Sequence, residues 1–227
     1  MKQLVLDLLL PAPNSFADFV AGDNAEPLYQ IGQWLAHDAH ARSIYLWGEA
    51  GTGKSHLLRS ACQQLDTRQA IFIDASTSKL PDLIPGDIHL LVDNVEALDA
   101  EGQIRLFDHY NTLKEGGGFF LAAGPLPPML LNLRDDLTTR LGWGLVYQIR
   151  PLSDDDKAQA LKQRASQLGF ELSDDMADYL LLHARRDLPS LYRHLDEVNT
   201  LALSRKKPVT LALLRSVIQQ TQLAIDF

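Results

Sequence analysis

The chain has 227 residues, of which 46% are hydrophobic and 22% charged, and its formal net charge is −8. This composition is ordinary for a globular protein in water and leaves room for one large domain or two small ones. The acidic balance and the lack of a Lys/Arg block argue against strong general DNA binding through phosphate contacts. No apolar run approaches the ~18 residues of a membrane span.

The N-terminal stretch MKQLVLDLLLPAP is short and is interrupted by Gln3 and Asp7, which argues against a secretion signal. Cys62 is the only cysteine, so no intramolecular disulfide can form, as is typical of a reducing compartment. We therefore expect a cytoplasmic protein whose residues 1–14 form a flexible, proline-punctuated tail.

Short apolar runs alternate with helical patterns between residues 15 and 150. Continuous apolar runs are typical of strands buried on both faces. They predict strands at Ser43–Trp47, Ala70–Asp74, His89–Asp93, Phe119–Ala123 and Leu145–Ile149. Helices are expected at about 26–38, 54–65, 100–114 and 134–141 from their periodicity. The alternation favours a three-layer αβα domain, residues 15–150, around a parallel sheet.

No strand pattern remains after Pro151. Ser153 with Asp156 three residues on resembles a capping box, although Asp replaces the usual Glu or Gln. Ser173 and Thr210 are suitable caps for two further helices, and a fourth helix is expected over Leu188–Ser204. We expect residues 151–227 to form a small all-helical unit.

The stretch GEAGTGKS directly follows the first predicted strand and fits the pattern G-x-x-x-x-G-K-[ST] at every fixed position. Glycines let consecutive backbone N–H groups point into one concavity, which the positive end of a helix closes. In this pattern the lysine reaches the β- and γ-phosphates and the hydroxyl binds Mg²⁺. ADP or ATP with Mg²⁺ is the expected ligand, and a glycine-rich turn that binds nothing is the alternative. The nucleotide-binding residues would be Gly48, Glu49, Ala50, Gly51, Thr52, Gly53, Lys54 and Ser55, with His56 beside the loop.

A second acid is expected at the tip of a neighbouring strand, and HLLVDN supplies Asp93. With Ser55, Asp93 would hold the Mg²⁺; the alternative is a strand-ending Asp that caps a turn. The next residue is Asn94, where many related ATPases place a carboxylate that polarises water. An amide is a weaker base, so intrinsic hydrolysis should be slow, unless Glu96 substitutes.

A phosphate loop, an Asp-ended strand and a helical appendage together resemble an AAA+ ATPase. SFADFVAGDNAEPL (Ser15–Leu28) is similar to the N-terminal segment of the DnaA family that packs near the adenine. LTTRLGWG (Leu137–Gly144) resembles that family's arginine-finger box, and Pro151–Leu182 looks like the start of its helical lid. The resemblance implies an AAA+ fold with a C-terminal lid over nearly the whole chain.

The resemblance places Arg140 on the arginine finger, which completes a neighbouring subunit's nucleotide site. The alternative is a surface arginine paired with Asp135 or Asp136. Two positions depart from the family: Ala123 and Pro189 stand where phosphate-sensing residues are usual, and Arg185, Arg186 or Arg193 could compensate. These gaps favour a nucleotide held as a structural ligand, with a weak or absent ATPase of its own. The three tryptophans receive no functional role.

QLVLDL resembles the hexapeptide by which replication proteins dock on the sliding clamp. A flexible peptide of this kind needs no fold of its own. The docking residues would be Gln3, Leu4, Leu6 and Leu8. An edge strand or a core-packing tail is the alternative. Gln222–Phe227 fits the same pattern, either as a second docking point or as the frayed end of the last helix.

DnaA continues beyond its lid into a DNA-binding domain, whereas this sequence ends at Phe227. A clamp peptide followed by a DnaA-like module resembles the regulatory inactivators of DnaA. The resemblance implies an adaptor that docks on the DNA polymerase III sliding clamp (β) and presents Arg140 to DnaA-bound ATP, ending initiation competence. A stand-alone ATPase such as a helicase-loading factor, or a nucleotide-inert bridging module, would be the alternatives. The sequence leaves open whether the protein forms a homo-oligomer.

Overall fold

The computed structural model describes residues 19–37, 41–66, 69–185 and 187–225, with side chains as far as residue 219. The chain divides into two compact units. One is Asn14–Pro151, and the other contains Leu152–Phe227. Each unit is described by itself.

The first unit is built on a five-stranded sheet in the order β2-β3-β4-β1-β5, in which every pairing is parallel. The strands are β1 (Ser43–Trp47), β2 (Ala70–Asp74), β3 (His89–Asp93), β4 (Phe119–Gly124) and β5 (Leu145–Gln148). The five predicted strands are confirmed, with β4 one residue longer and β5 one residue shorter than expected. The short apolar runs were therefore a sufficient signal for this sheet.

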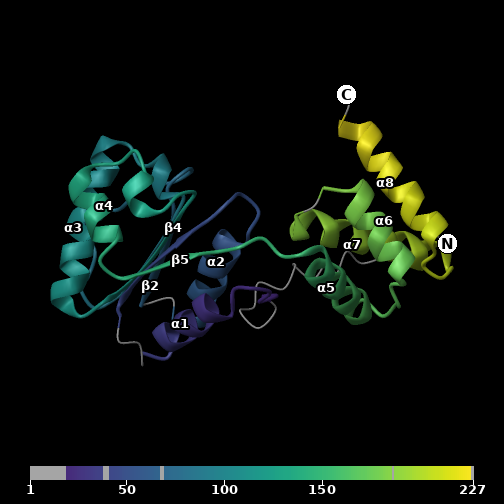
Figure 1. Ribbon diagram of the computed structural model, residues 1–227, viewed down its shortest axis with the longest axis horizontal. Helices are drawn as coiled ribbons and strands as arrows, with labels where there is room; N and C mark the ends of the chain where they lie inside the picture. Colours follow the sequence, from purple (N-terminus) through teal and green to yellow (C-terminus); the bar gives the residue numbers. More distant parts are fainter. Residues whose placement is uncertain (1–18, 38–40, 67–68, 186, 226–227) are drawn as a thin grey trace, which may run out of the picture. The chain divides into compact units, whose positions relative to one another are not determined.

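Helices cover both faces of the sheet (Figure 1). They are α1 (Ala25–Leu35), α2 (Lys54–Gln64), α3 (Ala100–Gly116) and α4 (Asp135–Leu141), with short 3₁₀ turns η2 (Val95–Ala97) and η3 (Pro128–Leu130). Successive side chains of a strand point to opposite faces. In β1, Ile44 and Leu46 pack with α1 and α2, whereas Tyr45 belongs to the core beneath α3 and α4. Burial on both faces explains why β1, β3 and β4 read as continuous apolar runs.

The second unit consists of four helices, α5 (Asp154–Gln167), α6 (Asp174–His183), α7 (Leu188–Arg205) and α8 (Leu211–Ile225). Its core is centred on fully buried leucines, among them Leu161, Leu180, Leu195 and Leu214. The helical pattern of the sequence is confirmed. Within the described ranges, no helix combines the length and the apolar character that crossing a membrane needs.

The caps of these helices follow the sequence signals with one exception. Ser153 and Asp156 form a complete capping box, in which the Ser153 hydroxyl accepts from the Asp156 amide at 3.1 Å. The Thr210 hydroxyl accepts from the amide of Leu213 at 3.3 Å. Ser173 stands at the N-cap of α6, but its side chain accepts no capping hydrogen bond. An aspartate thus replaces the usual glutamate of the box without loss of the reciprocal bonds.

Candidate functional site: a glycine loop at the end of the first strand

The loop between β1 and α2 has a backbone that only glycine tolerates. The φ angles are 153° at Gly48, 81° at Gly51 and 97° at Gly53. A Cβ atom on Gly48 would lie 2.4 Å from the backbone oxygen of Ile149, which is far inside van der Waals contact. Gly53 is also the N-cap of α2, so the positive end of that helix faces the loop. The glycines of the motif are therefore sterically required at these positions.

The ammonium group of Lys54 is held over the loop by the loop's own carbonyls. Nζ donates to the carbonyl oxygens of Gly48 at 2.7 Å and Glu49 at 2.8 Å. The buried Thr52 braces the same turn, since its hydroxyl donates to the Glu49 carbonyl at 3.0 Å. Ser55 follows on the first turn of α2 and is exposed. A lysine and a hydroxyl thus lie at the helix end where an anion is favoured.

Two acidic residues share the electrostatic environment of Lys54. Burial lowers the pKa of Lys54, and the negative charges of Asp93 and Glu96 oppose that shift. Both carboxylates come from the segment that ends β3 and enters η2. Lys54 of the loop therefore interacts electrostatically with Asp93 at the tip of β3. In the sheet β4 lies between β1 and β3, so this acid is two strands away and not on the neighbouring strand that the sequence analysis expected.

Asp93 has an unusual environment for a buried carboxylate. It is only 1% exposed; Oδ1 accepts from the amide of Asn94 at 3.1 Å, and Oδ2 has no donor among the described residues. An unpaired buried carboxylate oxygen is costly unless a cation or water meets it, and oxygen is the ligand that Mg²⁺ prefers. Asp93 and Ser55 are therefore suited to hold Mg²⁺, which when bound neutralises charge on phosphate oxygens. No denser cluster of metal-ligating side chains occurs in the described part of the chain.

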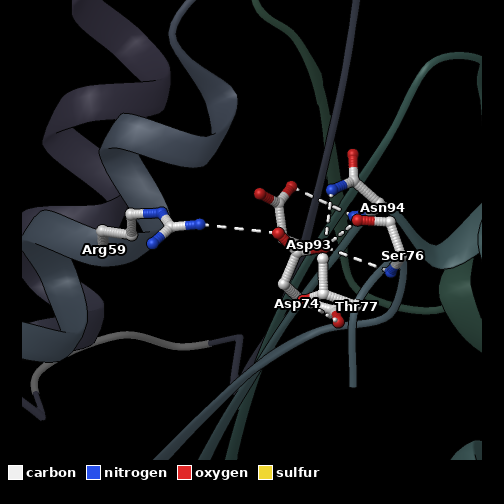
Figure 2. A network of polar contacts seen from close by, with 6 residues as sticks. All are labelled: Arg59, Asp74, Ser76, Thr77, Asp93 and Asn94. Atoms are coloured by element: carbon white, nitrogen blue, oxygen red, sulfur yellow. Dashed lines mark hydrogen bonds and ion pairs between the residues drawn. The ribbon is translucent and has the colours of Figure 1, made fainter. Parts of the chain in front are cut away.

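Asn94 is not placed to act as a base. Its side chain points toward Asp74, the last residue of β2 (Figure 2). Its φ angle is 54°, and its Nδ2 donates to Asp74 Oδ1 at 2.9 Å. Asp74 also accepts from the hydroxyl of Ser76 at 2.6 Å and lies 3.5 Å from Nη2 of Arg59 on α2. The Ser76 hydroxyl is the main cause of the lowered pKa of Asp74. Sequence reasoning missed Asp74; the available signal was an acid ending the strand next to β3, directly opposite Asp93.

Glu96 has a perturbed acidity, although the residue as a whole is exposed. Partial loss of hydration raises the pKa of Glu96, the carboxylates of Asp93 and Asp74 raise it further, and Lys54 opposes them. A carboxylate of raised pKa near a phosphate loop has the properties of a general base. The sequence analysis gave Glu96 as the possible substitute for the carboxylate that position 94 lacks, and the charge of Lys54 in the loop acts on the pKa of this residue.

The N-terminal segment reaches the loop through Phe19. A Cβ on Gly53 would lie 2.7 Å from the Phe19 ring, and the rings of Phe19 and His56 are 5.9 Å apart. Asn24 fastens this segment to the end of the sheet, since its side chain donates to the Arg150 carbonyl at 3.0 Å and accepts from the Arg150 amide at 2.8 Å. The sequence grouped Ser15–Leu28 near the adenine without distinguishing Phe19; residues 15–18 lie outside the described residues.

Arg140 lies on α4 and rests on aromatic rings. Its guanidinium carbon is 3.8 Å from the centroid of Trp143 and 5.3 Å from that of Phe107 on α3. No carboxylate of the described residues pairs with Arg140, and Asp136 pairs with Arg134 instead, at 2.7 Å. The alternative of a surface ion pair with Asp135 or Asp136 is thus not what the structure shows. Sequence reasoning gave Trp143 no role, although it lies in the same quoted motif as Arg140.

The other residues that the sequence analysis singled out either have a defined position in the structure or lie outside the described residues. Ala123 is fully buried in β4, and Pro189 is in the first turn of α7. The helix α8 runs through Ile225, so the first residues of the C-terminal hexapeptide have a helical backbone. The expected clamp-docking residues Gln3, Leu4, Leu6 and Leu8, like Arg186, fall outside the described residues.

Comparison with solved structures shows which known proteins have a similar fold. DnaA domain III of Thermotoga maritima matches with a TM-score of 0.73 at 18% identity, covering 92% of this chain and 97% of that one. AMPPCP-bound DnaA from Aquifex aeolicus matches with a TM-score of 0.72 at 21% identity, covering 87% and 70%. The RuvB Holliday junction branch migration motor of Thermotoga maritima has a TM-score of 0.69 at 17% identity, covering 91% and 72%. These likenesses show the fold.

The helical unit adds a more specific match. Residues 154–218 fit the family model described as "Hda, lid domain". The matched range begins at the first residue of α5 and ends within α8, so it contains α5, α6 and α7 and the first part of α8. The chain therefore has the fold of a DnaA-like AAA+ protein, and its C-terminal helices match the model of the Hda lid domain.

Proposed function

We propose that this protein is a nucleotide-bound AAA+ regulator of replication initiation in the cytoplasm, which docks on the sliding clamp and stimulates hydrolysis of DnaA-bound ATP in trans. The observation that carries the proposal is the match of the lid to the Hda model on a base with the DnaA fold. The coarser conclusion, an AAA+ protein related to replication initiation, needs only that observation. The trans mechanism needs Arg140 in addition.

The environment of Arg140 supports this mechanism. A guanidinium in an ion pair is already neutralised, and a phosphate would have to displace its carboxylate. Arg140 has no such partner within the described residues and retains an uncompensated positive charge. Its contacts are aromatic side chains from α3 and the residues after α4. An arginine of this kind can be offered to a phosphoryl group bound by another protein.

The nucleotide of this chain itself would be ADP or ATP, bound by Gly48–Ser55 with Mg²⁺ at Ser55 and Asp93. The AMPPCP-bound relative from Aquifex aeolicus supports this assignment. Lys54→Ala should abolish binding of ADP in calorimetry without unfolding the chain. If the folded variant binds as the wild type does, this loop is not the nucleotide site. If binding is lost but stimulation of DnaA is unchanged, the nucleotide-inert bridging module is the better account.

The decisive experiment is hydrolysis of DnaA-bound ATP in the presence of clamp loaded on DNA. Addition of this protein should accelerate hydrolysis, and Arg140→Ala should remove about 10³-fold or more of the acceleration while clamp binding is retained. Arg134→Ala is the matched control, because Arg134 begins the same helix but is already paired with Asp136. Stimulation by the Arg140→Ala variant at the wild-type rate would eliminate the mechanism. Rapid hydrolysis by this chain alone would favour a stand-alone ATPase.

Clamp docking requires a separate test, because the peptide lies outside the described residues. Pull-down on immobilised clamp should lose the protein when Gln3 and Leu6 are replaced by alanine. The matched variant Gln222→Ala, in the C-terminal copy of the pattern, should be retained on the clamp. Loss only in the Gln222→Ala variant would move the docking peptide to the other terminus.

A further inference from the structure

Trp143 is the most exposed large aromatic residue near Arg140. Its side chain follows α4 and is 53% exposed, whereas Trp34 of the same unit is fully buried. Two cations lie over its ring: Arg140, with the guanidinium carbon 3.8 Å from the centroid, and Lys114 of α3, with Nζ at 4.5 Å. A tryptophan with a purely structural role would be expected to bury its ring rather than leave half of it in water.

The anchoring of α4 brings Arg140 to this ring. Leu137 and Leu141 are buried in the core beneath α3, so the orientation of the helix is fixed. Arg140 precedes Leu141 and emerges at the edge of that contact, where Phe107 of α3 contributes a second ring at 5.3 Å. The Nε atom of Arg140 is buried without an acceptor among the described residues. The inner end of the guanidinium is therefore enclosed and makes no hydrogen bond that would fix its direction.

Stacking restrains a guanidinium in a way that an ion pair does not. The π face of an indole attracts the cation through its quadrupole, while the N–H donors of the guanidinium lie in its own plane. A stacked arginine keeps its charge and its terminal donors, and it loses only rotational freedom. A carboxylate at the same place would restrain the side chain but would also occupy the donors that a phosphate needs.

We propose that Trp143 is a positioning residue for Arg140: it holds the guanidinium by stacking, so that the terminal N–H groups face a phosphoryl group on the partner protein. This inference rests on the proposed function of Arg140. Stacking on Trp143 explains how an arginine without an ion pair is kept in one orientation. Preordering of this kind lowers the entropy lost when the phosphoryl group is engaged.

The test compares two variants. Trp143→Phe keeps an aromatic face, whereas Trp143→Leu keeps an apolar side chain and removes the aromatic face. Hydrolysis of DnaA-bound ATP is measured in single turnovers, with clamp on DNA, over a range of concentrations of this protein. Trp143→Leu should lower the maximal rate by about 2- to 30-fold, the range that a lost cation–π contact implies, with little change in the half-saturating concentration. Trp143→Phe should recover most of that rate.

A second readout is independent of DnaA. The Nε–H resonance of Arg140, assigned by its loss in Arg140→Lys, should exchange with water faster in Trp143→Leu than in the wild type. Unchanged exchange, or a wild-type maximal rate in Trp143→Leu, would overturn the positioning role. A raised half-saturating concentration at an unchanged maximal rate would make Trp143 a docking contact and would also overturn it. If Arg140→Ala itself stimulates normally, the proposed function fails, whereas the exchange measurement still decides the stacking.

Discussion

The side-chain amide of Asn94 donates a hydrogen bond to the carboxylate of Asp74 across 2.9 Å. The two residues are close because β2 and β3 are parallel neighbours whose last residues, Asp74 and Asp93, are opposite each other. Position 94 therefore follows Asp93, the acid proposed to hold Mg²⁺, yet its side chain contacts the end of the neighbouring strand β2. In this chain the carboxylate and the amide form a link between two strand ends, and the acids whose charges reach Lys54 are Asp93 and Glu96.

A double-mutant cycle should measure this link. Asn94→Asp would place two carboxylates in contact, and we expect a loss of about 1 to 3 kcal/mol in the free energy of unfolding at pH 7. Aspartate is chosen because it tolerates the positive φ at position 94. Adding Asp74→Asn restores one amide and one carboxylate with their places exchanged, and should recover much of the loss. Urea denaturation of the four proteins gives the coupling energy, and purely additive losses would show that the pair does not interact.

The raised pKa of Glu96 predicts a pH dependence of nucleotide affinity. At pH 8 the carboxylate is charged and repels bound phosphate, so Glu96→Gln should bind ADP without magnesium about several-fold more tightly than the wild type. Since burial raises the pKa of Glu96, the wild-type carboxylate begins to take up its proton at a higher pH than an ordinary glutamate, and the repulsion decreases as the pH falls. The difference in affinity between the two proteins should therefore shrink at low pH.

Titration calorimetry from pH 8 to pH 5 checks this expectation. The glutamine variant serves as the control, because titration of the ADP phosphates affects both proteins equally. An affinity difference that is constant over the whole range would mean that the charge of Glu96 does not reach the bound phosphate.

The elements of the fold that were predictable are those whose signals are local. Five short apolar runs located the strands, because none has polar alternation: β1, β3 and β4 are buried on both faces, and the edge strands β2 and β5 are half-buried. The glycine loop between β1 and α2 was recognisable because Gly48 and Gly53 meet steric conditions set by a strand end and a helix start. Ser153 located the first lid helix, because a capping box involves residues only three apart.

The contacts that were missed join residues distant in sequence. Asp74 and Asn94 are 20 positions apart and meet only through the strand register. Phe19 reaches Gly53 across an intervening helix and strand, and Phe107 meets Arg140 because α3 and α4 pack together. Trp143 was within the motif that suggested Arg140, but an aromatic residue two positions beyond a helix has no periodicity to indicate its neighbour. Spacing alone carries no information on such pairs.

Gly48→Ala should damage both folding and nucleotide binding. The new Cβ would lie 2.4 Å from the Ile149 oxygen, a backbone atom that is itself fixed by a 2.7 Å bond from the Ile149 amide to the Trp47 carbonyl. We expect a loss of about 2 kcal/mol or more, and no detectable heat with ADP. Gly32→Ala is the matched control: it lies in α1 with nothing within 4 Å of the added atom, so it should stabilise by about 0.5 to 1 kcal/mol. A Gly48→Ala variant with wild-type stability would contradict the close approach of β5 to the loop.

The lid contains a buried ion pair whose removal should be costly. Arg164 of α5 is 8% exposed and donates through Nη2 to both carboxylate oxygens of Asp196 on α7, at 3.0 Å and 3.2 Å. Asp196→Ala would leave the guanidinium charge buried, and we expect a loss of about 3 kcal/mol. The matched control is Asp174→Ala, which removes a pair with Lys162 from an 83% exposed carboxylate and should change stability little. Thermal unfolding of both variants checks the difference. Equal shifts would mean that Arg164 finds water or another acceptor once Asp196 is gone.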